Sequence, residues 1–405
     1  MGNRRTYIWD GARTSYGKFF GALKDVPAPV LGSTAIRAIL KKNHSLYECI
    51  DVVFMGQVLT AGVGQNPARQ AALLAGLPTR CHAESFGLVC ASSLAALSHA
   101  HRIIQLGEAE CVIAGGMESM SNAPGIIRRT KKLSGDHSIA RLLEKGDATP
   151  ETIVIDSMLH DGLTEPSDPD HASMGMLADM CARERDITRD AQERFSYTSF
   201  MRAYQAEQRG WLREYITSVS IDDKVHLHDE GIRYPQLEDM RRQKPAFSRS
   251  GSVTASTSSQ IADGASALVL ASGFALGMDK SIKPLARIVA CASYSGDPLW
   301  FTTAPIGAIK SVLKKAGLSV HDIDLFEINE AFAVVPLITM RELGIAREQV
   351  NIWGGAIARG HPLGASGTGI LGALALQLRA LNRKYGIAVA CHGGGGAVAV
   401  LIESV

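Results

Sequence analysis

The chain has 405 residues, of which 46% are hydrophobic and 20% are charged. This length exceeds what a single hydrophobic core usually serves, so we expect two domains or a repeated unit. The 42 basic and 40 acidic residues leave a net charge of +2. Such a balance provides no overall field for nucleic acid or an anionic membrane, so we expect no nucleic-acid partner.

The seven cysteines are an odd number, and their spacing matches no metal site. We therefore expect no metal ion, and reduced thiols in a reducing compartment. The sequence contains no apolar run of the roughly 18 residues that a membrane helix needs, which argues against stable membrane insertion. No secretory signal is evident, so a cytoplasmic location is expected.

The first 125 residues alternate between short apolar runs and apolar residues at helical spacing. The runs predict strands at 7–9, 52–55 and 111–114, and the helical patterns predict helices at 31–40, 66–74 and 91–106. Cys90 directly precedes the third helix. Free amides and the dipole at a helix N-terminus lower the pKa of a thiol, which makes Cys90 a candidate nucleophile. The alternative is a small buried hydrophobic residue.

Residues 126–248 are more charged and contain fewer apolar runs, which is typical of an insertion lying over a core. Residues 249–275 return to the apolar pattern. From residue 276 the patterns predict strands at 287–292, 324–328, 387–390 and 398–402, with helices at 307–316 and 370–381. We therefore predict an N-terminal core half (1–125 and 249–275), an inserted domain (126–248) and a C-terminal core half (276–405).

A glycine-rich stretch at 351–370 surrounds one histidine, His361, which is followed by Pro362. Glycines permit close backbone approach, and the proline biases His361 toward an extended conformation. A histidine held in such a loop before an apolar helix is a candidate for catalysis. The alternative is a structural loop with a bystander histidine. Nothing in the sequence explains the choice of Arg359 in this stretch.

The two core halves repeat the same order of elements. In each half, a helix opened by small residues leads to a strand that ends in glycines, at Gly115-Gly116 and Gly393-Gly394. Strand–helix alternation predicts mainly parallel sheets covered by helices. We expect two related α/β domains whose loops meet at a shared site. The side chains that follow strands or open helices are Cys90, Asn329, His361 and Cys391.

Five segments carry a resemblance to one family: Cys90-Ala91-Ser92, Gly115-Gly116-Met117-Glu118-Ser119-Met120-Ser121, Asn329-Glu330-Ala331-Phe332-Ala333, 354–367 and 391–395. In this order and at this spacing they resemble the signatures of the thiolases, from about residue 6 to the C-terminus. The resemblance implies a duplicated, layered αβαβα core with an inserted loop domain. It also implies acyl transfer to or from coenzyme A (CoA), with a carbon–carbon bond made or broken, as in fatty acid metabolism.

The resemblance assigns roles to the catalytic candidates. Cys90 is expected to carry the acyl group as a thioester, His361 to accept its proton, and Cys391 to act as the acid and base at the acyl α-carbon. His361 and a water held by Asn329 are expected to form one oxyanion hole. The backbone amides of Cys90 and Gly393 are expected to form the second.

The resemblance also implies that CoA and acetyl-CoA are substrates, without a prosthetic group, in a homodimer or homotetramer. The expected CoA-binding or substrate-binding residues are Met174, Phe247, Ser259 and Phe332. Three positions depart from the family pattern. Gly87 stands where Asn is usual, Ser93 where Gly is usual, and Ser173 where His is usual, which leaves substrate preference and loop packing open.

Two other functions remain possible from the sequence. A decarboxylating ketoacyl synthase of the same superfamily would use cysteine with histidines, and it would lack a second catalytic cysteine such as Cys391. A non-catalytic acyl-CoA-binding protein could keep the fold, but the complete catalytic set argues against it. Among thiolase substrates, we expect short acyl chains to be preferred. The physiological direction, cleavage or condensation, is not fixed by the sequence.

Overall fold

The structure is a computed structural model that describes residues 4–43, 46–127, 154–168, 172–277 and 283–405. Residues 128–153 and 169–171 of the predicted insertion lie outside the described residues. Within the described ranges, no helix combines the length and the apolar character needed to cross a bilayer.

One continuous path of paired strands runs through the molecule. Its order is β13-β14-β15-β12-β1-β11-β5-β3-β4, with β2 paired to β11 and β8 paired to β1. The bounds along this path are β13 (Leu325–Ile328), β14 (Tyr385–His392), β15 (Gly396–Glu403), β12 (Ala286–Ser295), β1 (Thr6–Thr14), β11 (Ala262–Ser272), β5 (Cys111–Ser119), β3 (Val52–Gly56), β4 (His82–Phe86), β2 (Gly17–Lys18) and β8 (Ile216–Thr217).

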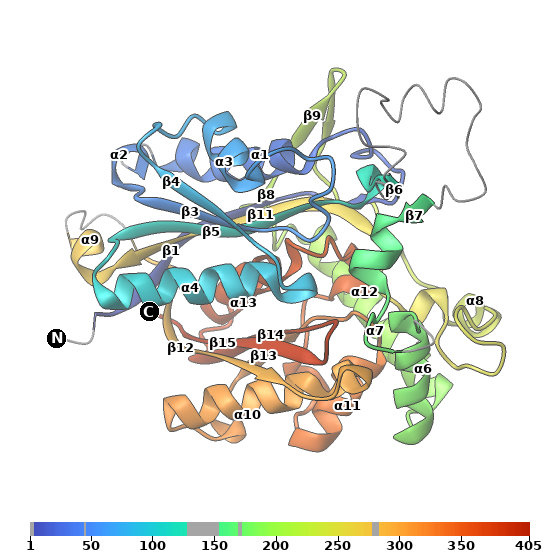
Figure 1. Ribbon diagram of the computed structural model, residues 1–405. Helices are drawn as coiled ribbons and strands as arrows, with labels where there is room; N and C mark the ends of the chain where they lie inside the picture. The colour runs from blue at the N-terminus through green and yellow to red at the C-terminus, as the bar shows by residue number, and fades with distance from the viewer. Residues whose placement is uncertain (1–3, 44–45, 128–153, 169–171, 278–282) are drawn as a thin grey trace, which may run out of the picture.

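Helices lie on both sides of this path and between its two halves (Figure 1). The outer helices are α1 (Ala28–Lys42), α2 (Leu46–Cys49), α3 (Pro67–Leu74), α9 (Gly273–Gly277), α10 (Ala304–Ala316) and α11 (Val334–Leu343), and the central ones are α4 (Ser92–Leu106) and α13 (Ser366–Ala380). Both central helices contact strands of both halves. The predicted layered αβαβα architecture is confirmed.

The two halves of the sheet are joined at a short seam. β1 and β12 pair over three residues only, Thr6–Ile8 against Ala286–Ile288. On either side of the seam the strands diverge around α4 and α13 (Figure 1). Apolar side chains of these helices, such as Leu97 and Leu374, form one buried cluster with strands of both halves. Burying one leucine contributes about 1.5–3 kcal/mol, so this central cluster holds the halves together.

The remaining elements cover one end of the two halves. They are β6 (Gly125–Ile127), β7 (Val154–Asp156), the π-helical turn η4 (Leu159–Leu163), α6 (Met174–Glu184), α7 (Arg189–Gln208), β9 (Val219–Ile221), β10 (Lys224–His226) and α8 (Leu237–Arg241). α7 packs on α12 (Ala356–Arg359), and α6 packs on α11. This part of the chain therefore lies over the loops that carry the candidate catalytic residues.

The predicted predominance of parallel strands is wrong. β11 pairs antiparallel with both β1 and β5, and β15 pairs antiparallel with both β12 and β14, while the pairs β3–β4, β3–β5, β13–β14 and β1–β8 are parallel. Two features reverse the chain. The turn at 393–395 makes β14 and β15 a hairpin, using positive φ at Gly394 (83°) and Gly395 (77°). β11 returns after the insertion and inserts between β1 and β5.

Several elements are longer than predicted. β1 extends past Asp10-Gly11 through an irregularity in its pairing, and β5 continues through Gly115-Gly116. In β5 the glycines serve close packing, because a Cβ on Gly116 would lie 1.9 Å from the carbonyl oxygen of Gly364. The stretch at 351–370 is also more regular than predicted. It contains the helical turn α12, and α13 begins at Ser366 rather than at residue 370.

Candidate active site

Cys90 lies in a strained turn at the start of α4. The turn is the 3-10 segment η1 (Val89–Ala91), in which Val89 has a φ of 45°. A β-branched residue with positive φ costs about 1–3 kcal/mol, and such strain is concentrated at functional sites. The hydroxyl of Ser92 stabilises the turn by accepting from the Leu88 amide (2.8 Å) and donating to the Val89 carbonyl (2.7 Å).

The surroundings of Cys90 keep its thiol protonated. Burial raises the pKa of Cys90 to about 12, a backbone hydrogen bond lowers it, and the carboxylate of Glu118 raises it again. The backbone amide at the helix N-terminus lowers this pKa, as expected, but burial raises it by more, so the net shift of the pKa is upward. Cys90 therefore needs a base to accept its proton when it reacts.

His361 is buried and held from both ring nitrogens. Its Nδ1 lies 2.5 Å from the hydroxyl oxygen of Ser366, and its Nε2 lies 3.3 Å from Nδ2 of Asn329. The Ser366 hydroxyl donates to the Pro362 carbonyl (2.9 Å), so it accepts from Nδ1–H. This assigns the lone pair to Nε2. Burial lowers the pKa of His361 to about 4, so the ring is neutral at pH 7 and can act as a base.

The loop around His361 packs against the turn that carries Cys90. Cys90 contacts an apolar cluster formed by Leu59, Met120, Met158 and Leu363. Leu363 follows His361 by two residues. Ile261 packs on the same cluster and pairs with His361 in an isolated β-bridge. The nucleophile candidate and the base candidate therefore share one apolar environment.

Asn329 and Cys391 complete the central group. Asn329 follows β13, and its backbone N–H donates to the Val389 carbonyl of β14 (2.9 Å). Its Oδ1 is buried and has no hydrogen-bond partner among the described residues, so it can accept from a substrate or water. Cys391 lies in β14, which packs against η1. Burial, and then the neighbouring Cys90, raise the pKa of Cys391.

The four predicted CoA-binding residues meet beside this group. Met174, the first residue of α6, has its Sδ 3.7 Å from the position of a Cβ on Gly393. The rings of Phe247 and Phe332 pack edge to face, with their centroids 5.8 Å apart. The amide of Ser259 donates to the Ala331 carbonyl (2.9 Å). Phe247 is 38% exposed and Phe332 is 8% exposed, so the aromatic wall runs from the interior to the surface.

Three buried carboxylates hold the catalytic loops in place. The sequence alone did not indicate a role for them. Glu118 accepts from the amide of Gly364 (2.8 Å), Glu330 from that of Ile357 (3.1 Å), and Glu165 from that of Gly394 (2.9 Å). Burial raises the pKa of Glu118 to about 7. A charged residue inside an apolar segment is a signal of such a structural role. Glu118 and Glu330 both lie in segments that resemble thiolase signatures, but neither was expected to take part in the chemistry.

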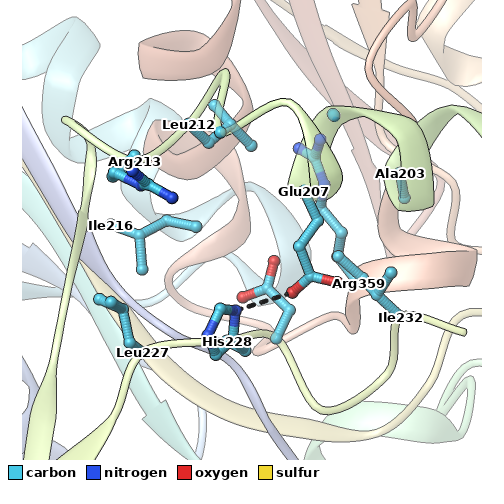
Figure 2. Close-up of a pocket in the computed structure, with 12 residues that line it drawn as sticks. Ala203, Glu207, Leu212, Arg213, Ile216, Leu227, His228, Ile232 and Arg359 are labelled. Atoms are coloured by element: carbon cyan, nitrogen blue, oxygen red, sulfur yellow. Dashed lines mark hydrogen bonds and ion pairs between the residues drawn. The ribbon is translucent and has the colours of Figure 1, made fainter.

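Arg359, at the end of α12, was left unexplained by the sequence. It is buried and lines a separate pocket together with residues of α7 and the 227–232 segment (Figure 2). Neither Cys90 nor Cys391 lines this pocket.

The three departures from the family pattern have different structural settings. A Cβ on Gly87 would meet only the Gln57 carbonyl oxygen, at 4.0 Å, so the first carbon of a side chain would cause no clash there. The Ser93 hydroxyl accepts from the amide of Thr368 (3.0 Å) and thereby links α4 to α13. Ser173 caps α6 by accepting from the Met176 amide (3.4 Å).

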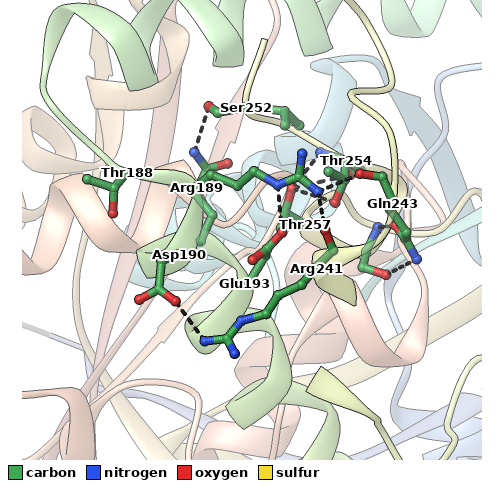
Figure 3. A network of polar contacts seen from close by, with 12 residues as sticks. Thr188, Arg189, Asp190, Glu193, Arg241, Gln243, Ser252, Thr254 and Thr257 are labelled. Atoms are coloured by element: carbon green, nitrogen blue, oxygen red, sulfur yellow. Dashed lines mark hydrogen bonds and ion pairs between the residues drawn. The ribbon is translucent and has the colours of Figure 1, made fainter. Parts of the chain in front are cut away.

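Arg189 holds residues 241–243, which lie just before Phe247 in the sequence (Figure 3 shows Arg189, Arg241 and Gln243). From the first turn of α7 it donates to the carbonyls of Arg241 and Gln243 and to the carboxylate of Glu193. We expect Arg189→Ala to loosen this segment and raise the KM for CoA thioesters about 10-fold, with kcat within about 2-fold of wild type. Steady-state kinetics of thiolysis would measure both constants.

The matched control for this prediction is Arg194→Ala. Arg194 lies on the same helix and is exposed, and among the described residues its side chain forms an ion pair with Asp190 alone. We expect its KM to equal that of wild type. An unchanged KM in Arg189→Ala would show that the Phe247 segment is held by other contacts.

Known proteins resemble this chain over almost its entire length. Residues 6–273 match the thiolase N-terminal domain and residues 282–404 match the thiolase C-terminal domain. An acetyl-CoA acetyltransferase of Cupriavidus necator is 41% identical, covering 98% of each chain. The cytosolic acetyl-CoA acetyltransferase of Gibberella zeae is 39% identical, also covering 98% of each chain.

A solved structure shows the same fold. Human mitochondrial 3-ketoacyl-CoA thiolase in complex with CoA superposes with a TM-score of 0.91 at 33% identity, covering 99% of this chain and 98% of the human one. Its similarity extends across both halves of the sheet and the insertion. The chain belongs to the thiolase family and is an acyltransferase.

Proposed function

We propose that this enzyme cleaves short 3-ketoacyl-CoAs with CoA, and condenses acetyl-CoA in reverse, through an acyl-Cys90 intermediate. The observation that supports this most directly is that the turn carrying Cys90 packs against β14, which carries Cys391, and against the loop of His361, a neutral imidazole whose unprotonated Nε2 accepts from Asn329. A nucleophile and a separate proton carrier are what the reaction needs. CoA and acetyl-CoA act as substrates, and the protein needs no prosthetic group.

In the proposed first half-reaction, His361 Nε2 accepts the Cys90 proton and the sulfur attacks the C3 carbonyl. The C2–C3 bond breaks, the acyl group stays on Cys90, and the electron pair passes to C2 of the leaving acetyl-CoA enolate. Cys391 donates its proton to C2. The oxygen charges that develop are stabilised by His361 with a water at Asn329, and by the amides of Cys90 and Gly393. Losing one such donor costs about 3–4 kcal/mol.

In the second half-reaction, the thiol of CoA gives its proton to the Cys391 thiolate. The CoA sulfur attacks the thioester, acyl-CoA leaves, and Cys90 regains its proton from His361. Protons and electrons balance over the cycle, and both cysteines return as thiols. Met174, Phe247, Ser259 and Phe332 are proposed to hold the CoA part of the substrate outside this centre.

A short acyl group is favoured by the packing at Cys90. Its neighbours Met158 and Leu363 are 7% and 2% exposed, and a Cβ on Gly162 of η4 would lie 2.9 Å from Leu363. The space beside the sulfur is therefore filled by apolar side chains. A long acyl chain would have to displace them, which costs free energy in a densely packed interior.

Thiolysis of 3-ketoacyl-CoAs from four to sixteen carbons tests this proposal. We expect kcat/KM to be highest at four carbons, and Met158→Ala to raise kcat/KM for eight carbons relative to four about 10-fold, because it opens space beside Cys90. Met176→Ala, at an exposed methionine of α6, is the control and should keep the wild-type profile. A wild-type rate that peaks at long chains would overturn the short-chain assignment.

The two alternative functions are less well supported. The curated relatives described above carry the name acetyl-CoA acetyltransferase, which is neither a ketoacyl synthase nor a binding protein. On the family resemblance we propose a homodimer or homotetramer. The cytosolic relative from Gibberella zeae supports a cytoplasmic location, which is also part of the proposal.

A further inference from the structure

A small pocket lies next to α12, apart from the two catalytic thiols (Figure 2). Its volume of about 60 Å³ would hold roughly four to six waters, at about 10–15 Å³ each. Ala203, Leu212, Ile216 and Ile232 give it a largely apolar wall. It reaches the surface at His228, whose side chain is 77% exposed.

Arg359 brings into this pocket a charge that has no ion-pair partner among the described residues. It is 7% exposed, and its hydrogen bond among the described residues goes to the Trp353 carbonyl. Its Nε has no partner there. No carboxylate of the described residues lies within ion-pair distance of it. Arginine stays protonated even when burial lowers its pKa, as it does here.

The carboxylates that line the pocket are occupied by other groups. Asp229 forms a bidentate pair with Arg13 (2.6 and 2.7 Å) and accepts from the Tyr16 amide (2.9 Å). Glu207 pairs with His228 at 3.1 Å (dashed in Figure 2). Arg213 adds a second cation to the lining. A buried guanidinium with an unused donor, facing an apolar pocket, is costly unless an acceptor joins it.

We propose that this pocket binds a small oxyanion, a single carboxylate or phosphate group, on the guanidinium of Arg359. The guanidinium fork matches both groups, and hydrogen bonds between charged partners are the strongest of their kind. The volume excludes a CoA thioester. Arg359 is separated from His361 only by Gly360, so the anion would also hold the end of α12 next to the catalytic loop. The inference concerns binding and stands independently of the proposed function.

The test is isothermal titration of the whole protein with inorganic phosphate and, separately, with acetate, at an ionic strength kept constant with sodium chloride. We expect one saturable site for at least one of them, with a dissociation constant below about 1 mM. Arg359→Met should weaken it about 10-fold or more, since it removes a charge-assisted contact. Arg209→Met is the control, because Arg209 stacks on Trp211 and does not line the pocket.

A second variant serves if Arg359→Met does not fold. Leu227 is 38% exposed at the pocket, so Leu227→Trp fills the space without changing the buried core, and it should abolish binding. Binding of phosphate alone or of acetate alone supports the site and identifies its ligand. Absence of saturable binding by wild type, or wild-type affinity in Arg359→Met or in Leu227→Trp, would overturn the proposal.

Discussion

Cys90→Ala is expected to reduce thiolysis by a factor of about 10⁴ or more, because the acyl group then has no attachment point. The variant should fold, since the small alanine side chain can occupy the strained turn. Incubation with acetyl-CoA followed by intact-protein mass spectrometry is the most direct measurement. Wild type should gain one acetyl group, and the variant should gain none.

The control for this experiment is Cys49→Ala. Cys49 is free and exposed, and it is not near the catalytic group in the chain. The Cys49→Ala variant should gain one acetyl group, as wild type does, and it should keep wild-type activity. Acetylation of Cys90→Ala at wild-type level would place the nucleophile elsewhere, and Cys391 would then be examined first.

His361→Asn is expected to lower kcat/KM by about 10³-fold, within the range for losing a general base. The pH dependence of wild type provides a second readout. Since the pKa of His361 is lowered to about 4, its neutral form persists well below pH 6.5. The acid limb of kcat/KM should therefore fall near pH 4, and not near the ordinary histidine pKa.

The same shift affects stability with a definite sign. The unfolded chain binds a proton at His361 near pH 6.5, but the folded chain binds it only near pH 4. Stability therefore rises with pH across this window, and it is lost as the pH falls from 6.5 toward 4. His101 is the matched control, because its pKa is also lowered to about 4 and it bonds Thr6 at 3.0 Å.

His101→Asn should flatten the dependence of stability on pH between 4 and 6.5 but leave the pH profile of kcat/KM unchanged. His361→Asn should change both. Thermal unfolding and initial rates, each measured from pH 4 to 7, separate these outcomes. A wild-type acid limb centred near pH 6.5 would contradict a buried, neutral His361.

The helices of the core were predictable because residues at their two ends mark where each helix starts and stops. Asn66 and Pro67 open α3, and Gly107 and Gly317 end α4 and α10 with positive φ. The direction of the strands was not predictable in the same way. β11 lies between β1 and β5 although it comes more than a hundred residues after both. Pairing of this kind depends on long-range packing that no local periodicity records.

The residues of the candidate site could be named from motifs, but their chemical states could not. The pKa values of Cys90 and His361 depend on desolvation by side chains from distant segments, such as Met158 and Ile261. The supporting carboxylates were hidden for a similar reason. The structural role of Glu118 can be recognised only when its hydrogen bond from Gly364, 246 residues away in the chain, is known.

The position of β1 also has a consequence for how the protein is made. This strand begins at Thr6, yet its two main-sheet neighbours are β11 and β12, which end at Ser272 and Ser295. A ribosome must therefore release about two thirds of the polypeptide before this first strand can pair with β11, the earlier of the two partners. Until then, apolar strand edges stay open to wrong pairing. We expect the nascent chain to depend on chaperones for most of its synthesis.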